Sequence, residues 1–125
     1  MKEELKNVMQ KAAEYLDDAQ YLFNDGRYES AVNRAYYSIF TAVQGLLLDK
    51  DVFVKTHAGT KLKFSELFLK TNLLPLDLGK IFEKALTLRQ EADYDFQFHV
   101  SNSDAEQLIA DAHLFLKTVT DFLQK

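Results

Sequence analysis

Residues Tyr28–Leu48, with the sequence YESAVNRAYYSIFTAVQGLLL, decide the fold that the chain is expected to adopt. Wound as a helix, this stretch is apolar on most sides, which is typical of the buried centre of a helical bundle. Two stripes run along it, one through Val32, Tyr36, Ile39, Val43 and Leu46, and a second, of small residues, through Ala31, Ala35, Ser38, Ala42 and Gly45. The small stripe predicts that another helix approaches this one closely.

Amphipathic segments lie on both sides of this central helix. Their apolar residues recur every three or four positions, which predicts helices with one buried face. The predicted helices are Lys2–Asn24, Ala58–Lys70, Pro75–Ala92 and Ser103–Leu123. Short connections between long helices favour an all-α, up-and-down bundle of four or five helices. We expect residues 1–125 to form a single domain, since this length supports one hydrophobic core.

Local signals place the ends of these helices. Pro75 suits a first helical position, where its missing N–H costs nothing. Ser103–Glu106 has the pattern of a capping box, with the serine as N-cap. Thr56 or His57 is expected to cap the helix that follows them. Phe53 and Val54, in the preceding loop, are expected to pack back onto the core.

The composition excludes some classes of protein. Hydrophobic residues make up 47% and charged residues 27% of the 125 positions, a globular balance. The net charge of −4 argues against strong nonspecific nucleic-acid binding, which needs many cations on phosphates. Five lysines between positions 50 and 70 form either a solvated helix face or a small basic patch.

Several kinds of site and location are disfavoured by what the sequence lacks. The absence of cysteine excludes disulfides and thiolate metal sites. The three histidines, His57, His99 and His113, form no helical pair with metal-ligand spacing, so we expect no metal and no cofactor. Met1–Lys6 lacks an apolar signal core, and no apolar run approaches the ~18 residues of a membrane span. A cytoplasmic protein without a membrane segment is the expectation.

The segment Arg89–Asp95 contains the densest mixture of titratable groups and aromatic rings. Arg89 follows Ala85 by four positions and Phe82 by seven, so it is expected at the margin of the buried stripe. Its guanidinium either caps helix carbonyls and pairs with a carboxylate, or holds a phosphodiester beside a tyrosine hydroxyl and a carboxylate.

Three segments, in this order, resemble the HEPN domain family: Asn33–Phe40 (NRAYYSIF), Lys55–Gly59 (KTHAG) and Arg89–Asp95 (RQEADYD). The likeness covers essentially the whole chain and implies a bundle of four or five helices that commonly dimerises. Many members of the family are encoded beside a small nucleotidyltransferase, in toxin–antitoxin or similar pairs. Many are metal-independent endoribonucleases that use an arginine followed, four to six residues later, by a histidine.

The ribonuclease pattern is incomplete in this chain. After Arg89, the family's histidine would fall at positions that hold Tyr94, Asp95 and Phe96, and His99 is too far along. The chain therefore resembles the branch with Arg-x-x-Ala-Asp-Tyr. The general acid or base of RNA cleavage then has no evident carrier, unless His57 enters the site from another helix.

The resemblance leads to one main hypothesis and two alternatives. The main hypothesis is a homodimeric binding and assembly component that is paired with a small nucleotidyltransferase, as the toxin-like member of the pair. The alternatives are a metal-independent endoribonuclease toxin that acts on RNA, and a nucleotide-binding regulatory module. The candidate residues are Arg89, Asp93 and Tyr94 for catalysis, and Asn33, Arg34, Tyr37 and His57 for binding.

Overall fold

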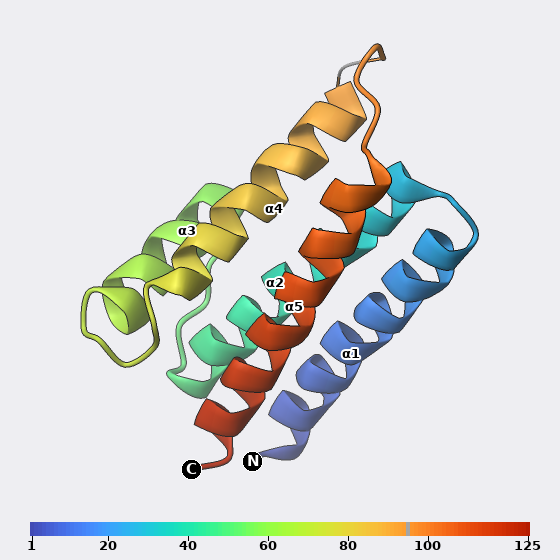
Figure 1. The fold of residues 1–125 in the computed structure, drawn as a ribbon. Coiled ribbons are helices and arrows are strands. Elements are labelled where there is room, and N and C mark those ends of the chain that lie inside the picture. Colours follow the sequence, from blue (N-terminus) through green and yellow to red (C-terminus); the bar gives the residue numbers. More distant parts are fainter. Residues whose placement is uncertain (95) are drawn as a thin grey trace.

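The structure, a computed structural model, describes residues 1–94 and 96–125, and it confirms the predicted all-α bundle (Figure 1). No strand occurs within these two ranges. The helices are α1 (Glu3–Asn24), α2 (Tyr28–Asp49), α3 (His57–Phe64), α4 (Asp77–Tyr94) and α5 (Asn102–Leu123), and a π-helical turn, η1 (Ser65–Leu69), directly continues α3. None of the helices in the described ranges is both long enough and apolar enough to cross a membrane.

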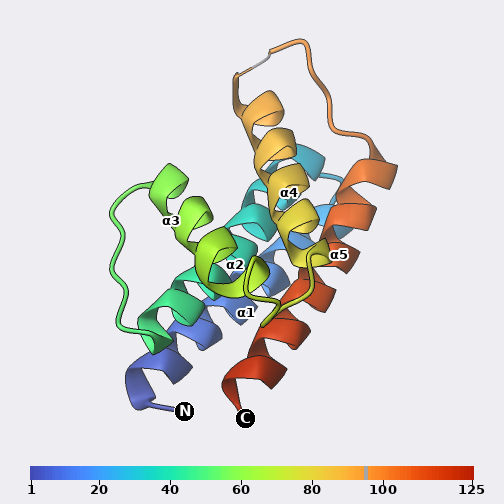
Figure 2. The same ribbon diagram turned by 90° about the vertical axis from the view of Figure 1, so that its left-hand side faces the viewer.

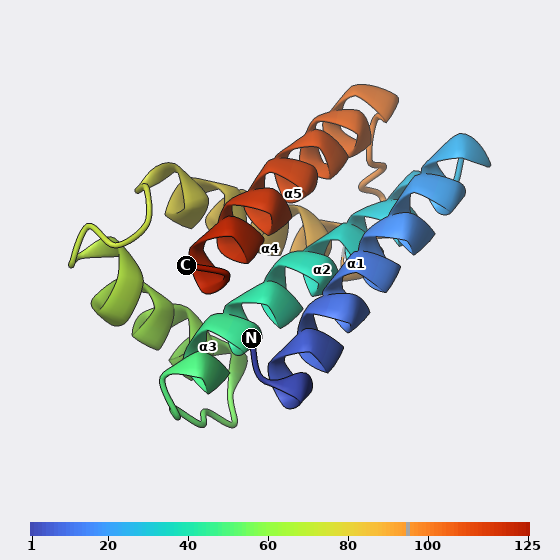
Figure 3. The same ribbon diagram turned by 90° about the horizontal axis from the view of Figure 1, so that it is seen from below.

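Helix α2 is the centre of the bundle, as its apolar pattern predicts. It contributes 13 buried residues, whereas α1, α4 and α5 contribute five, five and seven. Seen from below, α2 lies between α1 and α5 (Figure 3), and α3 and α4 cover its remaining side (Figure 2). Neighbours along the chain, α1 with α2 and α4 with α5, run antiparallel (Figure 1).

The small-residue stripe of α2 is filled by α1. Ser38 donates a hydrogen bond of 2.8 Å from Oγ to the carbonyl of Ala12. A Cβ added at Gly45 would lie 2.9 Å from Sδ of Met9, which is closer than real Cβ contacts. The predicted close approach of a second helix is therefore confirmed, and the helix belongs to the same chain. This stripe is consequently not free to receive a second copy of the protein.

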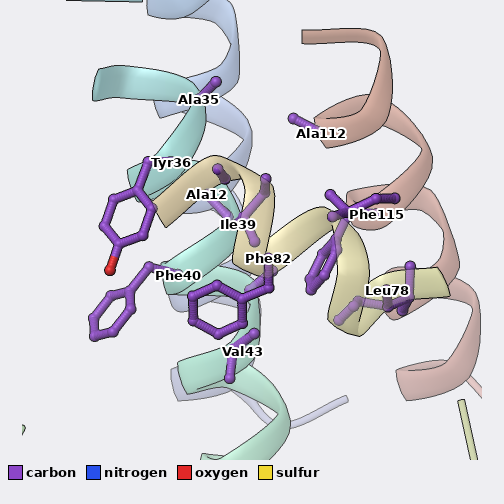
Figure 4. Close-up of a cluster of buried hydrophobic side chains, with 14 of the residues drawn as sticks. Ala12, Ala35, Tyr36, Ile39, Phe40, Val43, Leu78, Phe82, Ala112 and Phe115 are labelled. Carbon is purple, nitrogen blue, oxygen red and sulfur yellow. The ribbon is translucent and has the colours of Figure 1, made fainter. Parts of the chain in front are cut away.

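Aromatic side chains join the other helices to α2. The ring of Phe64 lies 5.9 Å from those of Phe82 and Phe115, which links α3 to α4 and α5. Figure 4 shows Tyr36 and Phe40 of α2 at one edge of this core, on the side of Phe82. The ring of Phe40 lies 6.5 Å from that of Phe82, which joins α2 to α4. Burial of each such ring contributes about 1.5–3 kcal/mol, so these contacts stabilise the packing of the helices.

Three local predictions about loops and caps are wrong. The exposed fraction of Phe53 is 79%, so this ring does not pack on the core, whereas Val54 is half-buried and packs against it as predicted. Helix α4 starts after Pro75, because the first carbonyl that accepts from a residue four positions on is that of Leu76. The N-cap of α5 is Ser101, whose hydroxyl accepts from the Asp104 N–H, and Ser103 lies inside the helix.

Thr56 is the N-cap of α3, which confirms one of the two predicted alternatives. Its side chain accepts a hydrogen bond from the Gly59 N–H at 2.9 Å. His57 is then the first residue of the helix rather than its cap. Its side chain remains available for contacts with α2.

The connection between α4 and α5 is tied to the first turn of α2. The Val100 N–H donates to a carboxylate oxygen of Glu29 at 3.3 Å, and the Asn102 amide donates to the Tyr28 hydroxyl at 2.8 Å. These bonds hold the end of the connection and the start of α5 next to the first turn of α2.

Candidate functional site

Arg89 lies on α4 with its side chain turned against α2, at the margin of the core, as its helical phase predicts. The side chain is 18% exposed. Its Cζ lies 5.2 Å from the ring centroid of Tyr36 and 5.4 Å from that of Tyr37, distances at which a cation is attracted to an aromatic ring. Its Nη2 donates to the Tyr37 hydroxyl at 3.4 Å, which is long for a hydrogen bond.

Asp93, one helical turn further along α4, is the carboxylate partner of Arg89. Its Oδ2 lies 3.3 Å from Nε of the arginine. This distance is that of an ion pair, but the N–H is not aligned for a hydrogen bond. Nε is buried and has no hydrogen-bond partner among the described residues. Since a guanidinium has five N–H donors, Arg89 retains donors for a ligand.

His57 enters the same region from α3. Its ring is stacked on that of Phe40, with the centroids 4.2 Å apart and the planes at 17°. Its Nδ1 lies 2.9 Å from the hydroxyl of Tyr36, within hydrogen-bond distance. The side chain of His57 itself is exposed. The ring is therefore held on one face and along one edge by α2.

Tyr36 connects the arginine and the histidine. Burial raises the pKa of its hydroxyl to about 12, an effect that the positive charge of Arg89 partly opposes and that Tyr37 reinforces. The hydroxyl therefore keeps its proton at neutral pH. We refer to Tyr36, Tyr37, His57, Arg89 and Asp93 as the Arg89 cluster.

A hollow of about 450 Å³ opens beside this cluster. His57 and Arg89 both line it, and so does Lys61, which forms an ion pair with Glu83 on α4. The remaining lining residues are Ala58, Leu86 and Gln90. A ligand in this hollow would thus meet the imidazole and the guanidinium together.

The predicted binding residues Asn33 and Arg34 line a second, smaller hollow of about 190 Å³, together with Asp93. Arg34 is exposed, and its Cζ lies 5.7 Å from the ring of Tyr15. That ring in turn lies 6.0 Å from the ring of Tyr37. Arg34 and Arg89 are thus connected through two tyrosines, and Asp93, the ion-pair partner of Arg89, lines the second hollow.

Tyr94 is not brought to Arg89. It is 75% exposed, and among the described residues no hydrogen bond or ring contact joins the two side chains. The tyrosines that contact the arginine come from α2 instead. Asp95, the last residue of the predicted segment, lies outside the described residues.

Sequence reasoning missed Tyr36 and Phe40 as site residues, because both belong to apolar positions of α2. The signal that could have found Tyr36 is its hydroxyl, since a buried tyrosine usually needs a hydrogen-bond partner. No signal along the chain shows that this partner is His57, which depends on how α3 crosses α2.

A larger hollow of about 570 Å³ lies away from the cluster, between α1, the end of α2 and the loop before α3. Its walls are mainly apolar and include Val8, Leu47 and Val54. It contains no mostly buried charge with donors to spare. In the part of the chain that the structure describes, no three His, Cys, Asp or Glu side chains are grouped so that they could hold a metal ion. The Arg89 cluster is therefore the candidate site.

Comparison with known proteins identifies the family that the sequence resembles. The family model of the HEPN domain matches residues 5–122. "Putative toxin MJ0142" of Methanocaldococcus jannaschii is 37% identical over 98% of this chain and 83% of its own length. "Putative toxin MJ0605" of the same organism is 33% identical over the whole chain and 92% of its own length. A "UPF0332 protein" of Thermotoga maritima is 32% identical over 91% of this chain and 86% of its own length.

The chain belongs to the HEPN domain family. The three segments that carry the resemblance lie on α2, at the start of α3 and at the end of α4. Tyr36, in the segment on α2, contacts one side chain from each of the other two segments, His57 and Arg89.

Proposed function

We propose that this chain is a toxin-like HEPN protein and that its Arg89 cluster binds a phosphate group of its ligand. The names of the two Methanocaldococcus jannaschii relatives support the toxin-like role. The buried side chains form one cluster, which supports a single domain over residues 1–125. A cytoplasmic location belongs to the same proposal.

The observation that carries the phosphate assignment is the state of Arg89. Its guanidinium is largely buried against two tyrosine rings, yet Nε has no hydrogen-bond partner among the described residues. A buried charged donor without an acceptor is unfavourable. The planar fork of an arginine matches the oxygens of a phosphate group. A phosphate group in the hollow would meet the terminal N–H groups of the guanidinium, since Nε itself is buried.

Calorimetric titration with ATP and with inorganic phosphate tests this proposal. Arg89→Ala should weaken binding about ten- to a hundredfold, as expected for the loss of charge-assisted hydrogen bonds worth about 1.5–3 kcal/mol. Arg27→Ala is the matched control, since it removes the same charge from an exposed residue that pairs with Asp25. Absence of binding by the unaltered protein, or equal binding by both variants, would overturn the proposal.

We propose further that the protein acts as a homodimer paired with a small nucleotidyltransferase. Membership of the HEPN family supports this assembly. The small-residue stripe of α2 does not, because α1 covers it. Light scattering over a wide range of concentrations tests the dimer, and a monomer throughout would contradict it. Co-purification with a nucleotidyltransferase encoded by the neighbouring gene tests the pairing.

A second candidate function is that of a metal-independent endoribonuclease. It is favoured by one observation: His57 lines the same hollow as Arg89, although positions 94–96 hold no histidine. The decisive assay compares RNA cleavage by the unaltered protein, Arg89→Ala and His57→Gln in the presence of a chelator. Equal cleavage by all three, or none by any, would sink this candidate.

A further inference from the structure

The Tyr36–His57 contact determines which nitrogen of the imidazole is left for a ligand. The Tyr36 hydroxyl faces Nδ1 at 2.9 Å, and Tyr36 is only 1% exposed. Within the described residues, the hydroxyl has no second hydrogen-bond partner. Its proton can therefore go to one acceptor, Nδ1 of His57.

In the neutral ring this contact fixes the tautomer. If Nδ1 carried the hydrogen, it would donate to the Tyr36 oxygen, and the buried O–H would lose its acceptor, which is unfavourable. If Nδ1 is bare, it accepts from the hydroxyl and every group is satisfied. The hydrogen of the neutral ring is then on Nε2.

In the protonated ring both nitrogens carry hydrogen, so Nε2 is again a donor. Nε2 therefore presents an N–H whether or not the ring is charged. The stack of the imidazole on Phe40 limits rotation of the ring. The edge that carries Nε2 is the one that Tyr36 does not occupy.

We infer that Tyr36 is a positioning residue that makes Nε2 of His57 a hydrogen-bond donor in both protonation states, so that His57 and Arg89 together offer N–H groups to the oxygens of one phosphate group. This inference rests on the proposed function, since it describes how the same hollow receives its ligand. Arg89 supplies charge and a planar fork, and His57 supplies a neutral donor beside it. In this arrangement His57 is not a general base at Nε2, because Nε2 has no lone pair to accept a proton.

The first test measures the tautomer without any ligand. Correlation of ring nitrogens with ring protons by NMR distinguishes hydrogen on Nε2 from hydrogen on Nδ1, and His57→Gln assigns the signal among the three histidines. At a pH that keeps the ring neutral, the unaltered protein should carry hydrogen on Nε2. Tyr36→Phe should raise the share of the Nδ1 form, whereas Tyr21→Phe, which alters an exposed tyrosine, should not.

The second test uses inorganic phosphate as the probe, at constant ionic strength. The terminal amide of glutamine occupies about the place of Nε2 and that of asparagine about the place of Nδ1, so His57→Gln should keep most of the affinity and His57→Asn should lose several-fold. Tyr36→Phe should also lose several-fold, while its circular dichroism spectrum stays that of the folded protein.

The outcomes separate this inference from the proposal on which it rests. Hydrogen on Nδ1 in the unaltered protein, or a tautomer unchanged by Tyr36→Phe, overturns the role of Tyr36. Equal phosphate affinity of His57→Gln and His57→Asn overturns the role of Nε2 as ligand donor. A protein with the expected tautomer that binds no phosphate refutes the proposed function and leaves the positioning by Tyr36 standing.

Discussion

Nε of Arg89 and Oδ2 of Asp93 lie 3.3 Å apart on successive turns of α4, but the N–H does not point at the carboxylate. The carboxylate therefore lowers the local positive charge without using the donor. An anionic ligand would compete with Asp93 for the guanidinium. Asp93 would therefore weaken the attraction of the Arg89 guanidinium for any other anion.

Asp93→Asn should raise the affinity for inorganic phosphate by up to about fivefold, because a partly exposed ion pair of this kind contributes about 0.2–1 kcal/mol. The free energy of unfolding should change by less than about 1 kcal/mol for the same reason. Asp121→Asn is the matched control, since it breaks a similar i, i+4 pair with Lys117 on α5. An equal gain in affinity in both variants would mean that only net charge matters.

Stability should fall at alkaline pH through Tyr36. A tyrosine in the unfolded chain ionises near pH 10, whereas burial raises the pKa of Tyr36 in the folded protein to about 12. The protonated Tyr36 hydroxyl favours the folded state. Its full contribution to the free energy of unfolding is present below pH 10, and about 3 kcal/mol is lost as the pH rises to 12. Denaturant unfolding of the unaltered protein and of Tyr36→Phe between about pH 10 and 12 measures this loss. The variant should show a shallower decline.

Phe40→Ala should cost roughly 3–5 kcal/mol of unfolding free energy, as for other large truncations in a core. Phe40 is 7% exposed and lies between His57 and the ring of Phe82. Phe53→Ala, at a ring that is 79% exposed, should change stability by less than about 0.5 kcal/mol. A loss below about 1 kcal/mol for Phe40→Ala would show that this edge of α2 is not part of the stabilising core.

Two neighbouring serines should respond differently to alanine. Ser101→Ala removes the N-cap of α5 and should cost about 1 kcal/mol. Ser103→Ala, inside the first turn, should stay within about 0.5 kcal/mol, since alanine favours helix and no cap is lost. Thermal unfolding of both variants shows which of the two substitutions destabilises the protein more. The reverse order would place the cap at Ser103.

The helices could be predicted from the sequence because each has a periodic apolar face, and the centre because α2 is apolar on most sides. The ends of the helices were harder to predict, because the same capping pattern can occur twice within a few residues. Ser101 and Ser103 both precede an acidic residue by three positions, as Asp104 and Glu106, and either pair could form a cap. Pro75 is compatible with a first helical position, but the turn it belongs to precedes α4.

The site could be predicted only in part. Helical phase placed Arg89 at the margin of the core and brought Asp93, four positions later, to the same face. Tyr94, five positions later, lies on a different face of the helix. The prediction that it lies beside Arg89 rested on proximity along the chain alone. The contacts of Tyr36 with Arg89 and with His57 depend on how α3 and α4 pack against α2, so no local pattern contains them.

The two ends of the chain lie at the same end of the bundle, and the α4–α5 connection lies at the opposite end (Figures 1 and 2). Because Arg89 is on the last turns of α4, a tag, fluorophore or surface tether at either terminus stands far from the cluster. A short peptide could also link the ends, with new termini opened elsewhere. The topology therefore suits circular permutation and immobilised binding assays that leave the cluster accessible.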